Sequence, residues 1–480
     1  MTSNHGANSS TTASSNTQPL TEHINVKAPQ TILQYQQVGG YRGFERALNT
    51  MSPQEVQQLV KDSQLKGRGG AGFPTGVKWS FVPFNDAVAK ANKYFICNAD
   101  EMEPGTFKDR LLMEGAPHQL IEGLMIGAYA IGANKAFIFL RGEYTLATKR
   151  LQHAIQEAYE AGLLGKKIKG TDYSLDMHLH TSAGRYICGE ETALINALEG
   201  KRANPRAKPP FPQVVGLFGR PTIVNNCETL CNLPHILKHG AQWFIDLSQS
   251  EDAGTKIYGA CGRVTQPGLW ELPMGPTIRD VLYEHAGGMQ EGLKLKGLLP
   301  GGASTDFLLP EHLDTPMTYN AISKAGSRLG TGGLIVLDDQ QCPVGMVRNL
   351  LQFFAQESCG WCTPCRDGLP WAVEILTRLE LGFGHYDDLD QLKKMCDFMW
   401  IGKTFCALAP GAVEPLQSAL KYFEDDFTAH IDKKCCPYCP NGHPEAHLYS
   451  HLQPHLQSIQ ANRLSGNQAS ACADINAGGQ

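Results

Sequence analysis

The sequence predicts an α/β domain, followed by a smaller region with a β-grasp-like order of strands and by a helical bundle. Strands and helices alternate between residues 93 and 180, which indicates an α/β sheet. Paired strands replace this alternation near residue 250, and from Pro343 onward the apolar spacing is that of helices. A chain of 480 residues is long enough for several domains.

In the first domain, Ser52 is expected to cap a short helix that runs to Leu65. Pro53 would take its first position and Glu55 would complete the capping box. Further along, we expect strands at 93–97, 136–140 and 175–180, helices at 120–131 and 145–160, and a proline-rich surface loop at 204–212.

The middle region is expected to form paired strands at 256–264 and 268–272, a helix from Thr277 to Glu284 and a returning strand at 295–299. After Pro343, four apolar residues fall on one helical face: Val347, Leu350, Leu351 and Phe354. Later helices are predicted at 370–379, 389–399 and 412–427. The predicted divisions are a disordered tail (1–30), the α/β domain (31–248), the β-grasp region (249–340), the bundle (341–432) and a disordered tail (433–480).

Composition excludes several function classes. A net charge of −5 provides no positive field for nucleic acid. The first 18 residues lack the apolar core of a signal peptide and the arginines of a transit peptide. The most apolar stretch, 120–140, is interrupted by Glu122, Asn134 and Lys135, so it is too polar to span a bilayer. Fifteen cysteines without a secretory signal indicate a reducing compartment.

Four cysteines have the spacing of an iron-sulfur site. Cys359, Cys362 and Cys365 form a C-x2-C-x2-C run, and Cys406 follows downstream. This run suits a 4Fe-4S cluster, whereas zinc sites usually pair cysteines two by two. Buried thiols without a metal are the alternative, but the polar loop around Gly360 and Pro364 does not favour it.

A glycine-rich loop, Gly67-Arg68-Gly69-Gly70-Ala71-Gly72, follows the first helix. It matches the dinucleotide fingerprint by letter, but that fingerprint needs a preceding strand, and Phe73 replaces the lysine of a Walker loop. Glycines let backbone N–H groups approach a phosphate, and Arg68 and Lys78 could neutralise its charge. A tight turn without a ligand is the alternative.

Polar groups follow the predicted strand at 93–97: Asn98, Asp100, Glu101 and Glu103. Ligands of open α/β sheets bind at this edge, and a solvated acidic turn is the alternative. A second segment with Tyr186, Gly189, Glu190 and Glu191 precedes a helix whose N-terminus favours anions. Further candidates are Asn225, Asn226, and the cation and aromatic ring of Lys208 and Phe211.

Together, these motifs resemble the NADH-binding flavoprotein subunit of bacterial respiratory complex I. The resemblance runs from about Gly40 to His430 and omits the first residues and the last fifty. It implies an atypical Rossmann-like FMN-binding α/β domain, a ubiquitin-like (β-grasp) domain, and a C-terminal four-helix bundle with one 4Fe-4S cluster. The implied ligands of the cluster are Cys359, Cys362, Cys365 and Cys406.

The resemblance also assigns residues to the cofactor and the substrate. The flavin would be held by Gly67, Gly69, Lys78, Asn98, Asp100, Glu101, Tyr186, Gly189, Glu190, Asn225 and Asn226, within the loop that contains Arg68, Gly70 and Gly72. NADH would lie against Phe73, Phe81, Lys208 and Phe211. Glu103 and Glu191, the candidate catalytic residues, would lie near its nicotinamide and ribose end. A further hypothesis is that Glu103 rejects NADPH by repelling its 2′-phosphate.

The implied function is that of the NADH dehydrogenase module of a proton-pumping NADH-quinone oxidoreductase. NADH gives up two electrons as a hydride and a cluster accepts one at a time, so a flavin must stand between them. Two alternatives remain: a diaphorase subunit of an NAD-linked hydrogenase or formate dehydrogenase, and an iron-sulfur electron carrier without nucleotide chemistry. The first is less favoured because no fused 2Fe-2S domain or extra ferredoxin cysteines occur.

The resemblance implies two partners, a thioredoxin-like 2Fe-2S subunit and the large iron-sulfur subunit of complex I. The chain would sit in the peripheral arm, on the cytoplasmic side of the plasma membrane, with only indirect membrane association. The tail departs from the family: Cys436-x2-Cys439 and the later His443, His447, His451 and His455 could bind zinc. A metal-free tail is favoured, because few apolar residues are present to build a core.

Overall fold

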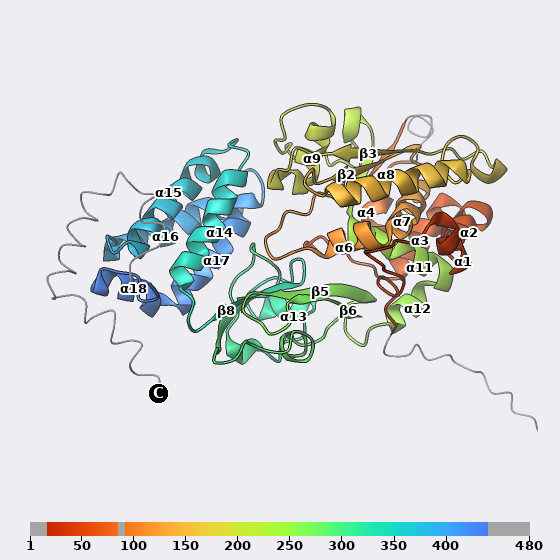
Figure 1. The fold of residues 1–480 in the computed structure, drawn as a ribbon. Helices are drawn as coiled ribbons and strands as arrows, with labels where there is room; N and C mark the ends of the chain where they lie inside the picture. Colours follow the sequence, from red (N-terminus) through yellow and green to blue (C-terminus); the bar gives the residue numbers. More distant parts are fainter. Residues whose placement is uncertain (1–16, 85–91, 440–480) are drawn as a thin grey trace, which may run out of the picture.

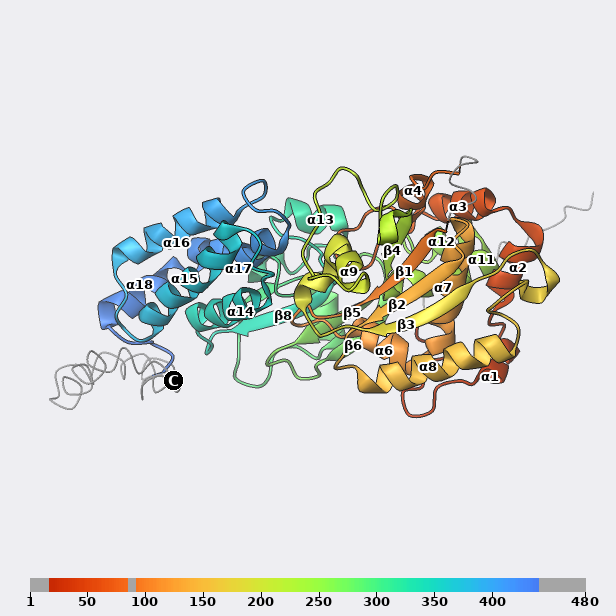
Figure 2. The same cartoon turned by 90° about the horizontal axis from the view of Figure 1, so that it is seen from above.

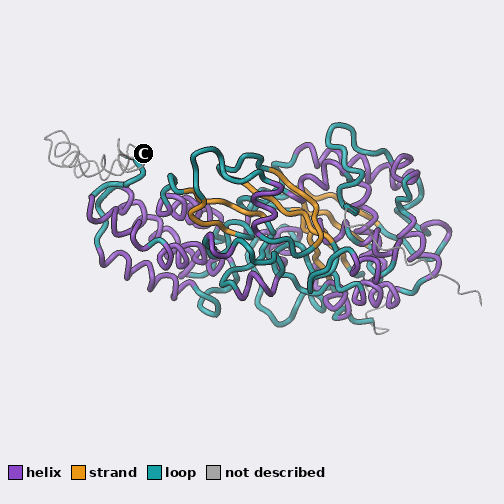
Figure 3. The backbone as a smooth tube through the Cα atoms, turned by 90° about the horizontal axis from the view of Figure 1, so that it is seen from below, coloured by secondary structure: helices purple, strands orange, loops and turns teal. Residues whose placement is uncertain are grey.

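The computed structural model describes residues 17–84 and 92–439. The predictions for residues 1–16 and for the histidines after residue 440 lie outside the described residues. An α/β domain, a second sheet and a helical bundle follow one another along the molecule (Figure 1). Figure 3 shows the strands in the middle of the molecule and helices toward both ends.

The first sheet is parallel, with the order β3-β2-β1-β4. Parallel strands place all their carboxyl ends at one edge, and β1 lies at the centre with Asn98 near its end. The strand β4 was not predicted, although its last residues Asn225 and Asn226 were candidate site residues. The bounds are Tyr94–Ala99 (β1), Lys135–Leu140 (β2), Asp176–Thr181 (β3) and Thr222–Asn226 (β4).

Helices cover this sheet (Figure 2), and nearly every side chain of α7 is buried. The capping box predicted for Ser52 and Glu55 is confirmed at the start of α3. The helix bounds are Ile32–Gln37 (α1), Arg42–Thr50 (α2), Pro53–Asp62 (α3), Thr75–Ser80 (α4), Lys108–Gly115 (α6), Pro117–Ala130 (α7), Thr145–Glu160 (α8), Glu191–Leu198 (α9), Cys227–Cys231 (α10), Leu233–His239 (α11) and Ala241–Asp246 (α12).

The prediction placed the start of the folded chain too far along the sequence, at residue 31. Leu20 is fully buried, so the segment from residue 17 is part of the folded core rather than of a disordered tail. The carboxylate of Glu271 accepts hydrogen bonds from the backbone N–H of Leu20 at 3.1 Å and of Thr21 at 2.8 Å. These contacts were invisible in the local sequence because the acceptor lies 250 residues away from Thr21.

The second sheet has the order β6-β5-β8-β7, with β5 and β8 parallel and both outer pairs antiparallel. The predicted helix at Thr277 is a single helical segment, η4 (Asp280–His285), and the Thr277 hydroxyl accepts the Asp280 N–H at 3.0 Å. The other bounds are Thr255–Cys261 (β5), Gly268–Pro273 (β6), Leu295–Leu299 (β7), Tyr319–Lys324 (α13) and Gly333–Asp338 (β8).

The bundle contains α14 to α17 and the shorter α18. Val347, Leu350, Leu351 and Phe354 of α14 are all buried, as their spacing predicted. The helix predicted at 412–427 is two helices, because Phe423 leaves the helical conformation. The bounds are Pro343–Glu357 (α14), Thr363–Glu380 (α15), Tyr386–Met399 (α16), Leu408–Tyr422 (α17) and Glu424–Lys433 (α18).

Two further boundaries differ from the prediction. Pro370 lies inside α15 instead of starting it, because Pro364 already occupies the first turn, where proline fits best. Cys435 and Cys436 are buried, so the folded part extends past residue 432. Within the described residues, no helix has both the length and the apolar character needed to cross a bilayer.

A buried carboxylate on α7 holds the chain between α1 and α2. Glu122 accepts hydrogen bonds from the Tyr35 hydroxyl at 2.7 Å, the Tyr41 N–H at 2.8 Å and the Phe44 N–H at 3.1 Å. Burial raises the pKa of Glu122, and these three donors oppose that rise. The carboxylate that made this stretch too polar for a membrane therefore has a structural role.

Replacing Glu122 by leucine would leave these donors buried without an acceptor. We expect Glu122→Leu to lower the free energy of unfolding by about 2–4 kcal/mol. Glu160→Leu, at the exposed end of α8, is the matched control and should change it by less than about 0.5 kcal/mol. Urea unfolding followed by circular dichroism measures both, and equal effects of the two substitutions would contradict the prediction.

Candidate functional site

Two adjoining cavities lie at the carboxyl edge of the first sheet. The smaller, which we call the polar cavity, has a volume of about 310 Å³, and the larger, the aromatic cavity, has a volume of about 910 Å³. They share lining residues from the glycine-rich loop, β1, the segment after β3, and β4. Of the predicted cofactor-binding residues, all except Arg68 and Lys208 line one cavity or both.

Asp100 supplies an uncompensated acceptor to the polar cavity. Its Oδ1 accepts the Ser182 hydroxyl at 3.0 Å, and its buried Oδ2 has no hydrogen-bond partner among the described residues. Burial raises the pKa of Asp100 to about 7, although Ser182 and Arg141 oppose the rise. A buried oxygen in this condition is stabilised by a ligand that donates a hydrogen bond to it.

Glu101 and Glu103 are held by the protein itself. Glu101 accepts the N–H groups of Asp109 at 2.8 Å and Arg110 at 3.0 Å, at the start of α6. Burial, followed by the charge of Asp109, raises the pKa of Glu101 to about 8. Glu103 accepts the Tyr186 hydroxyl at 2.6 Å and the Ser304 N–H at 2.7 Å.

The position of Glu103 does not favour its predicted role against NADPH. Its side chain lines the polar cavity, and it is not among the residues that line the aromatic cavity. Both of its carboxylate oxygens already accept hydrogen bonds, as described above. Burial also raises the pKa of this carboxyl group, with the Tyr186 and Ser304 hydrogen bonds opposing.

Three phenylalanines and a lysine characterise the aromatic cavity. Phe73, Phe81 and Phe211 are 48%, 53% and 53% exposed. Lys78 Nζ donates to a Glu191 carboxylate oxygen and to the Val224 carbonyl, each at 2.8 Å. Exposed aromatic faces beside a cation suit a planar, negatively charged ligand.

Lys208 is not among the residues that line either cavity, but it contacts two carboxylates that do. Its ammonium group lies 2.9 Å from a Glu190 carboxylate oxygen and 3.4 Å from one of Glu191. Burial alone would raise the pKa of Glu191. The positive charges and hydrogen bonds of Lys78, and then of Lys208, hold that pKa below its ordinary value. The other carboxylate, Glu190, accepts the N–H groups of Thr192 and Ala193, so the start of α9 already carries an anion.

Arg68 also differs from its predicted role. Its side chain is fully buried and donates to the carbonyl oxygens of Ala253 at 2.8 Å and Thr255 at 3.0 Å, so it points away from both cavities. The same loop approaches α13 closely: Gly72 has φ +65°, and a Cβ there would lie 2.6 Å from the Tyr319 ring. Arg68 and Gly72 therefore fix the loop to the second sheet and its helix.

A buried group of charges, not predicted from the sequence, lies beneath this loop. Lys108 Nζ is 2.8 Å from Asp109 Oδ1 and 2.8 Å from Glu228 Oε2, and Lys256 of β5 contacts the same Glu228 oxygen at 3.3 Å. Burial alone would raise the pKa of Glu228, but Lys108, Lys256 and Arg68 lower it to about 2. Asn226 joins this group by donating to Asp109 at 2.6 Å.

The second sheet also contributes walls that sequence reasoning missed. Gly301, Ser304, Arg328 and Thr331 line the polar cavity. The only feature of the sequence that could have indicated these residues is the glycine-rich composition of two short ranges. Residues 300–302 follow β7, and residues 330–333 lead into β8. Arg328 also pairs with Glu414 of α17 at 2.7 Å, which connects this wall to the bundle.

The four predicted cluster cysteines line one small pocket between the bundle and the segment at Ile187. Cys362 is the N-cap of α15, Cys365 lies in its first turn, and Cys406 precedes α17. Burial raises the pKa of Cys365 to about 12 and that of Cys406 to about 11. Such thiols lose their protons to a bound metal rather than to water.

The pocket of the four cysteines adjoins the polar cavity. Ile187, Cys406 and Leu408 line both. A group in the polar cavity and a metal centre on the four sulfurs would therefore be separated only by this shared wall. Short separation across packed protein is what electron transfer between two centres requires.

Comparisons with known proteins agree with this arrangement. A family model described as the Nuo51 FMN-binding domain matches residues 60–235, and one described as the NADH-ubiquinone oxidoreductase-F iron-sulfur binding region matches residues 345–430. The F subunits of NADH-quinone oxidoreductase from Salmonella typhimurium and Escherichia coli are each 58% identical over 416 residues, which cover 86% of this chain and 93% of the relative.

The protein of the same name from Mycobacterium tuberculosis is 47% identical over 425 residues, 88% of this chain and 95% of that protein. Among solved structures, an NAD+-reducing NiFe-hydrogenase in its H2-reduced state is similar with a TM-score of 0.74 and 33% identity. That likeness covers 85% of this chain and 68% of the hydrogenase chain.

Glu228→Gln tests the buried charges. Because its folded pKa of about 2 lies below the ordinary 4.5, ionised Glu228 adds stability above pH 4.5, and this is lost as the pH falls toward 2. We expect the substitution to cost about 3 kcal/mol of unfolding free energy at pH 7 and progressively less below pH 4.5. Urea unfolding at pH 7, 5 and 3, with the exposed Glu160→Gln as control, measures this, and a constant difference would contradict it.

Cys406→Ala tests the cysteine pocket. If the four cysteines of the pocket hold a 4Fe-4S cluster, removing one thiolate should cost the chain about four iron atoms and the associated visible absorption. Cys396→Ala is the matched control, since Cys396 is a buried thiol of α16 outside the pocket. Iron is measured per chain, and an unchanged iron content in Cys406→Ala would remove Cys406 from the ligand set.

Proposed function

The chain belongs to the family of NADH-quinone oxidoreductase F subunits, and from this premise we propose how its cavities divide the oxidation of NADH. Its function is that of the NADH dehydrogenase module of this enzyme. Its cofactors are FMN and a 4Fe-4S cluster, and NADH is its substrate. The assignment of individual residues to these groups is our proposal.

We place FMN in the polar cavity. The free oxygen of Asp100, the amide of Asn98 and the glycine-rich loop supply acceptors, donors and close backbone approach for a flavin and its hydroxyl-bearing chain. Asn98 is held in place because its amide donates to the Gly189 carbonyl at 3.0 Å. The remaining proposed FMN residues are Gly69, Gly70, Glu101, Tyr186, Gly189, Glu190 and Asn226 in the polar cavity, together with Gly67, Gly72, Lys78 and Asn225 of the adjoining aromatic cavity, toward which the cofactor would extend.

We place NADH in the aromatic cavity. Phe73, Phe81 and Phe211 offer faces for the adenine ring, and Lys78 offers positive charge to the phosphates. The carboxylate of Glu191 holds Lys78 in place, and Lys208 balances the charge of Glu191. We propose that Glu191 lies at the nicotinamide and ribose end, and that Glu103 acts from the polar cavity by positioning Tyr186.

The chemistry of hydride acceptance and one-electron release would be supplied by bound FMN. Gly69, Asn98 and Gly189 line both cavities, so they are the residues that would hold the two ligands next to each other. The observation that carries the proposal is Cys406, which lines both the polar cavity and the cluster pocket. The cluster ligands we propose are Cys359, Cys362, Cys365 and Cys406.

The fold of the second and third parts of the chain, its partner subunits and its location are also proposals. The order β6-β5-β8-β7, with a parallel central pair, supports a β-grasp (ubiquitin-like) domain. The lengths of α14 to α17 support a four-helix bundle to which α18 is added. We propose that a thioredoxin-like 2Fe-2S subunit and the large iron-sulfur subunit are the partners, in the peripheral arm on the cytoplasmic side of the membrane.

A diaphorase role in an NAD-linked hydrogenase is the second candidate, because the hydrogenase structure has a similar fold. Its 33% identity is well below the 58% of the Salmonella typhimurium and Escherichia coli relatives, which favours the first candidate. Co-purification from membranes followed by mass spectrometry separates the two. Recovery of quinone-reductase subunits supports the proposal, and recovery of hydrogenase subunits contradicts it.

The NADH site is tested by Phe211→Ala in an assay of NADH oxidation with ferricyanide. Loss of one aromatic face should weaken NADH binding by about 0.5–1.5 kcal/mol, which raises KM roughly twofold to tenfold and changes kcat little. The matched control, Phe398→Ala, removes an exposed phenylalanine of α16 outside both cavities. Wild-type protein with FMN but no NADH oxidation would contradict the function, and a lower kcat at unchanged KM would contradict the placement.

A further inference from the structure

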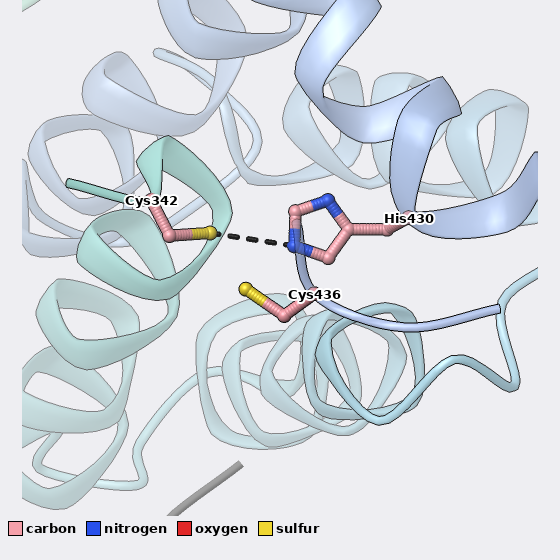
Figure 4. Close-up of side chains that lie close together, drawn as sticks. All are labelled: Cys342, His430 and Cys436. Atoms are coloured by element: carbon pink, nitrogen blue, oxygen red, sulfur yellow. Dashed lines mark hydrogen bonds between the residues drawn. The ribbon is translucent and has the colours of Figure 1, made fainter. Parts of the chain in front are cut away.

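A second group of metal-binding side chains lies at the other end of α14 from the cluster cysteines. The thiols of Cys342 and Cys436 and the imidazole of His430 point toward one another (Figure 4). Their ligand atoms all lie within 4.8 Å of one another. The three residues come from the start of α14, from α18 and from the segment after α18.

The distance between one sulfur and the imidazole nitrogen is close to that of a four-coordinate zinc site. Cys342 Sγ lies 3.3 Å from His430 Nε2. On a tetrahedral zinc ion, a thiolate sulfur and an imidazole nitrogen are about 3.5 Å apart, given bond lengths of about 2.3 and 2.05 Å. Only a small movement of the side chains is therefore needed to receive an ion.

The imidazole of His430 is already in the tautomer that a metal requires. Its Nδ1 lies 2.6 Å from the carbonyl oxygen of Asp426, which can only accept, so Nδ1 carries the proton. The lone pair of Nε2 then faces the two thiols. Metal-binding histidines characteristically donate their second N–H to such a carbonyl.

Backbone groups support a thiolate at Cys342. This residue is the N-cap of α14, a helix of 15 residues, and its sulfur accepts the Gly345 N–H at 3.3 Å. The N-terminus of a helix stabilises negative charge. The remaining metal-binding atoms are largely enclosed, because His430 is fully buried and Cys436 is 3% exposed.

The segment that carries Cys436 is fixed from both sides. The Tyr438 hydroxyl contacts Asp426 of α18 and accepts a hydrogen bond from Lys296 Nζ of β7 at 2.6 Å. On the other side, Gly382 lies so close to the Lys434 carbonyl that a Cβ there would clash. Cys436 is therefore held at the site before any ion arrives.

We propose that Cys342, His430 and Cys436 bind a zinc ion. Two sulfurs and one imidazole nitrogen suit zinc, and the absence of carboxylates from these three ligands does not suit magnesium or calcium. These three residues supply three of the four ligands of a tetrahedral zinc ion, and a water molecule or another donor would complete the site. The zinc thus joins the segment after α18 to the start of the bundle.

This site differs from the zinc hypothesis based on the sequence. It keeps Cys436, but its histidine, His430, lies before Cys436 rather than after it, and its other cysteine, Cys342, comes from the start of α14. It also lies away from the cluster: a helix of 15 residues is about 22 Å long, and Cys359 is just beyond the other end of α14. Its role is structural, separate from electron transfer.

The test measures zinc and iron in the full chain with its FMN and cluster, after dialysis against a weak chelator. Wild-type protein should contain about one zinc per chain. Cys342→Ser and Cys436→Ser should each lose that zinc and keep the iron. Cys396→Ser, a buried thiol of the same bundle, should keep both metals.

Zinc X-ray absorption is measured on the wild-type protein, so its result does not depend on whether a variant folds. Sulfur at about 2.3 Å together with nitrogen at about 2.0–2.1 Å supports the site, and a shell of oxygen alone overturns it. Wild-type protein with iron but no zinc also overturns the proposal, as does zinc retained by both serine variants. An intact mass two hydrogens lighter, restored in Cys436→Ser, would identify a disulfide in place of the metal and likewise overturn it.

Discussion

The paired charges of Lys108, Glu228 and Lys256 are the interaction on which the functional site depends. They come from α6, α10 and β5, so they join the first domain to the second sheet. Each charge would be costly to bury alone, and together they compensate one another. Asp109 extends the group to Asn226, at the point where both cavities meet.

The glycine-rich loop takes its shape from the same junction. Arg68 is buried against carbonyls of the second sheet, its N–H donates to Thr229 at 2.8 Å, and the Tyr319 hydroxyl donates to the Gly67 carbonyl at 2.7 Å. The backbone of the loop thus faces the cavities, and its charged side chain does not. The second sheet acts as a wall and a support for a site whose recognisable motifs lie mainly in the first domain.

Features with a local cause could be predicted from the sequence. The Ser52 and Glu55 capping box, the polar end of β1 and the triplet spacing of the cysteines depend on residues within a few positions of one another. The direction of the Arg68 side chain, the walls at Ser304 and Arg328, and the meeting of Cys342 with His430 depend on contacts between distant segments. The spacing of apolar residues along the chain gives no information about contacts between distant segments. The break at Phe423 was missed because apolar spacing continues across it.

The contact of Leu20 and Thr21 with Glu271 has a consequence for synthesis of the chain. These first folded residues leave the ribosome about 250 residues before their partner does. At roughly 5–20 residues per second, they wait between about 12 and 50 s. During that time the N–H groups of Leu20 and Thr21 lack their Glu271 acceptor. The first domain therefore cannot reach its final form as an independent unit during translation, and its N-terminal segment closes over the structure only after β6 has emerged.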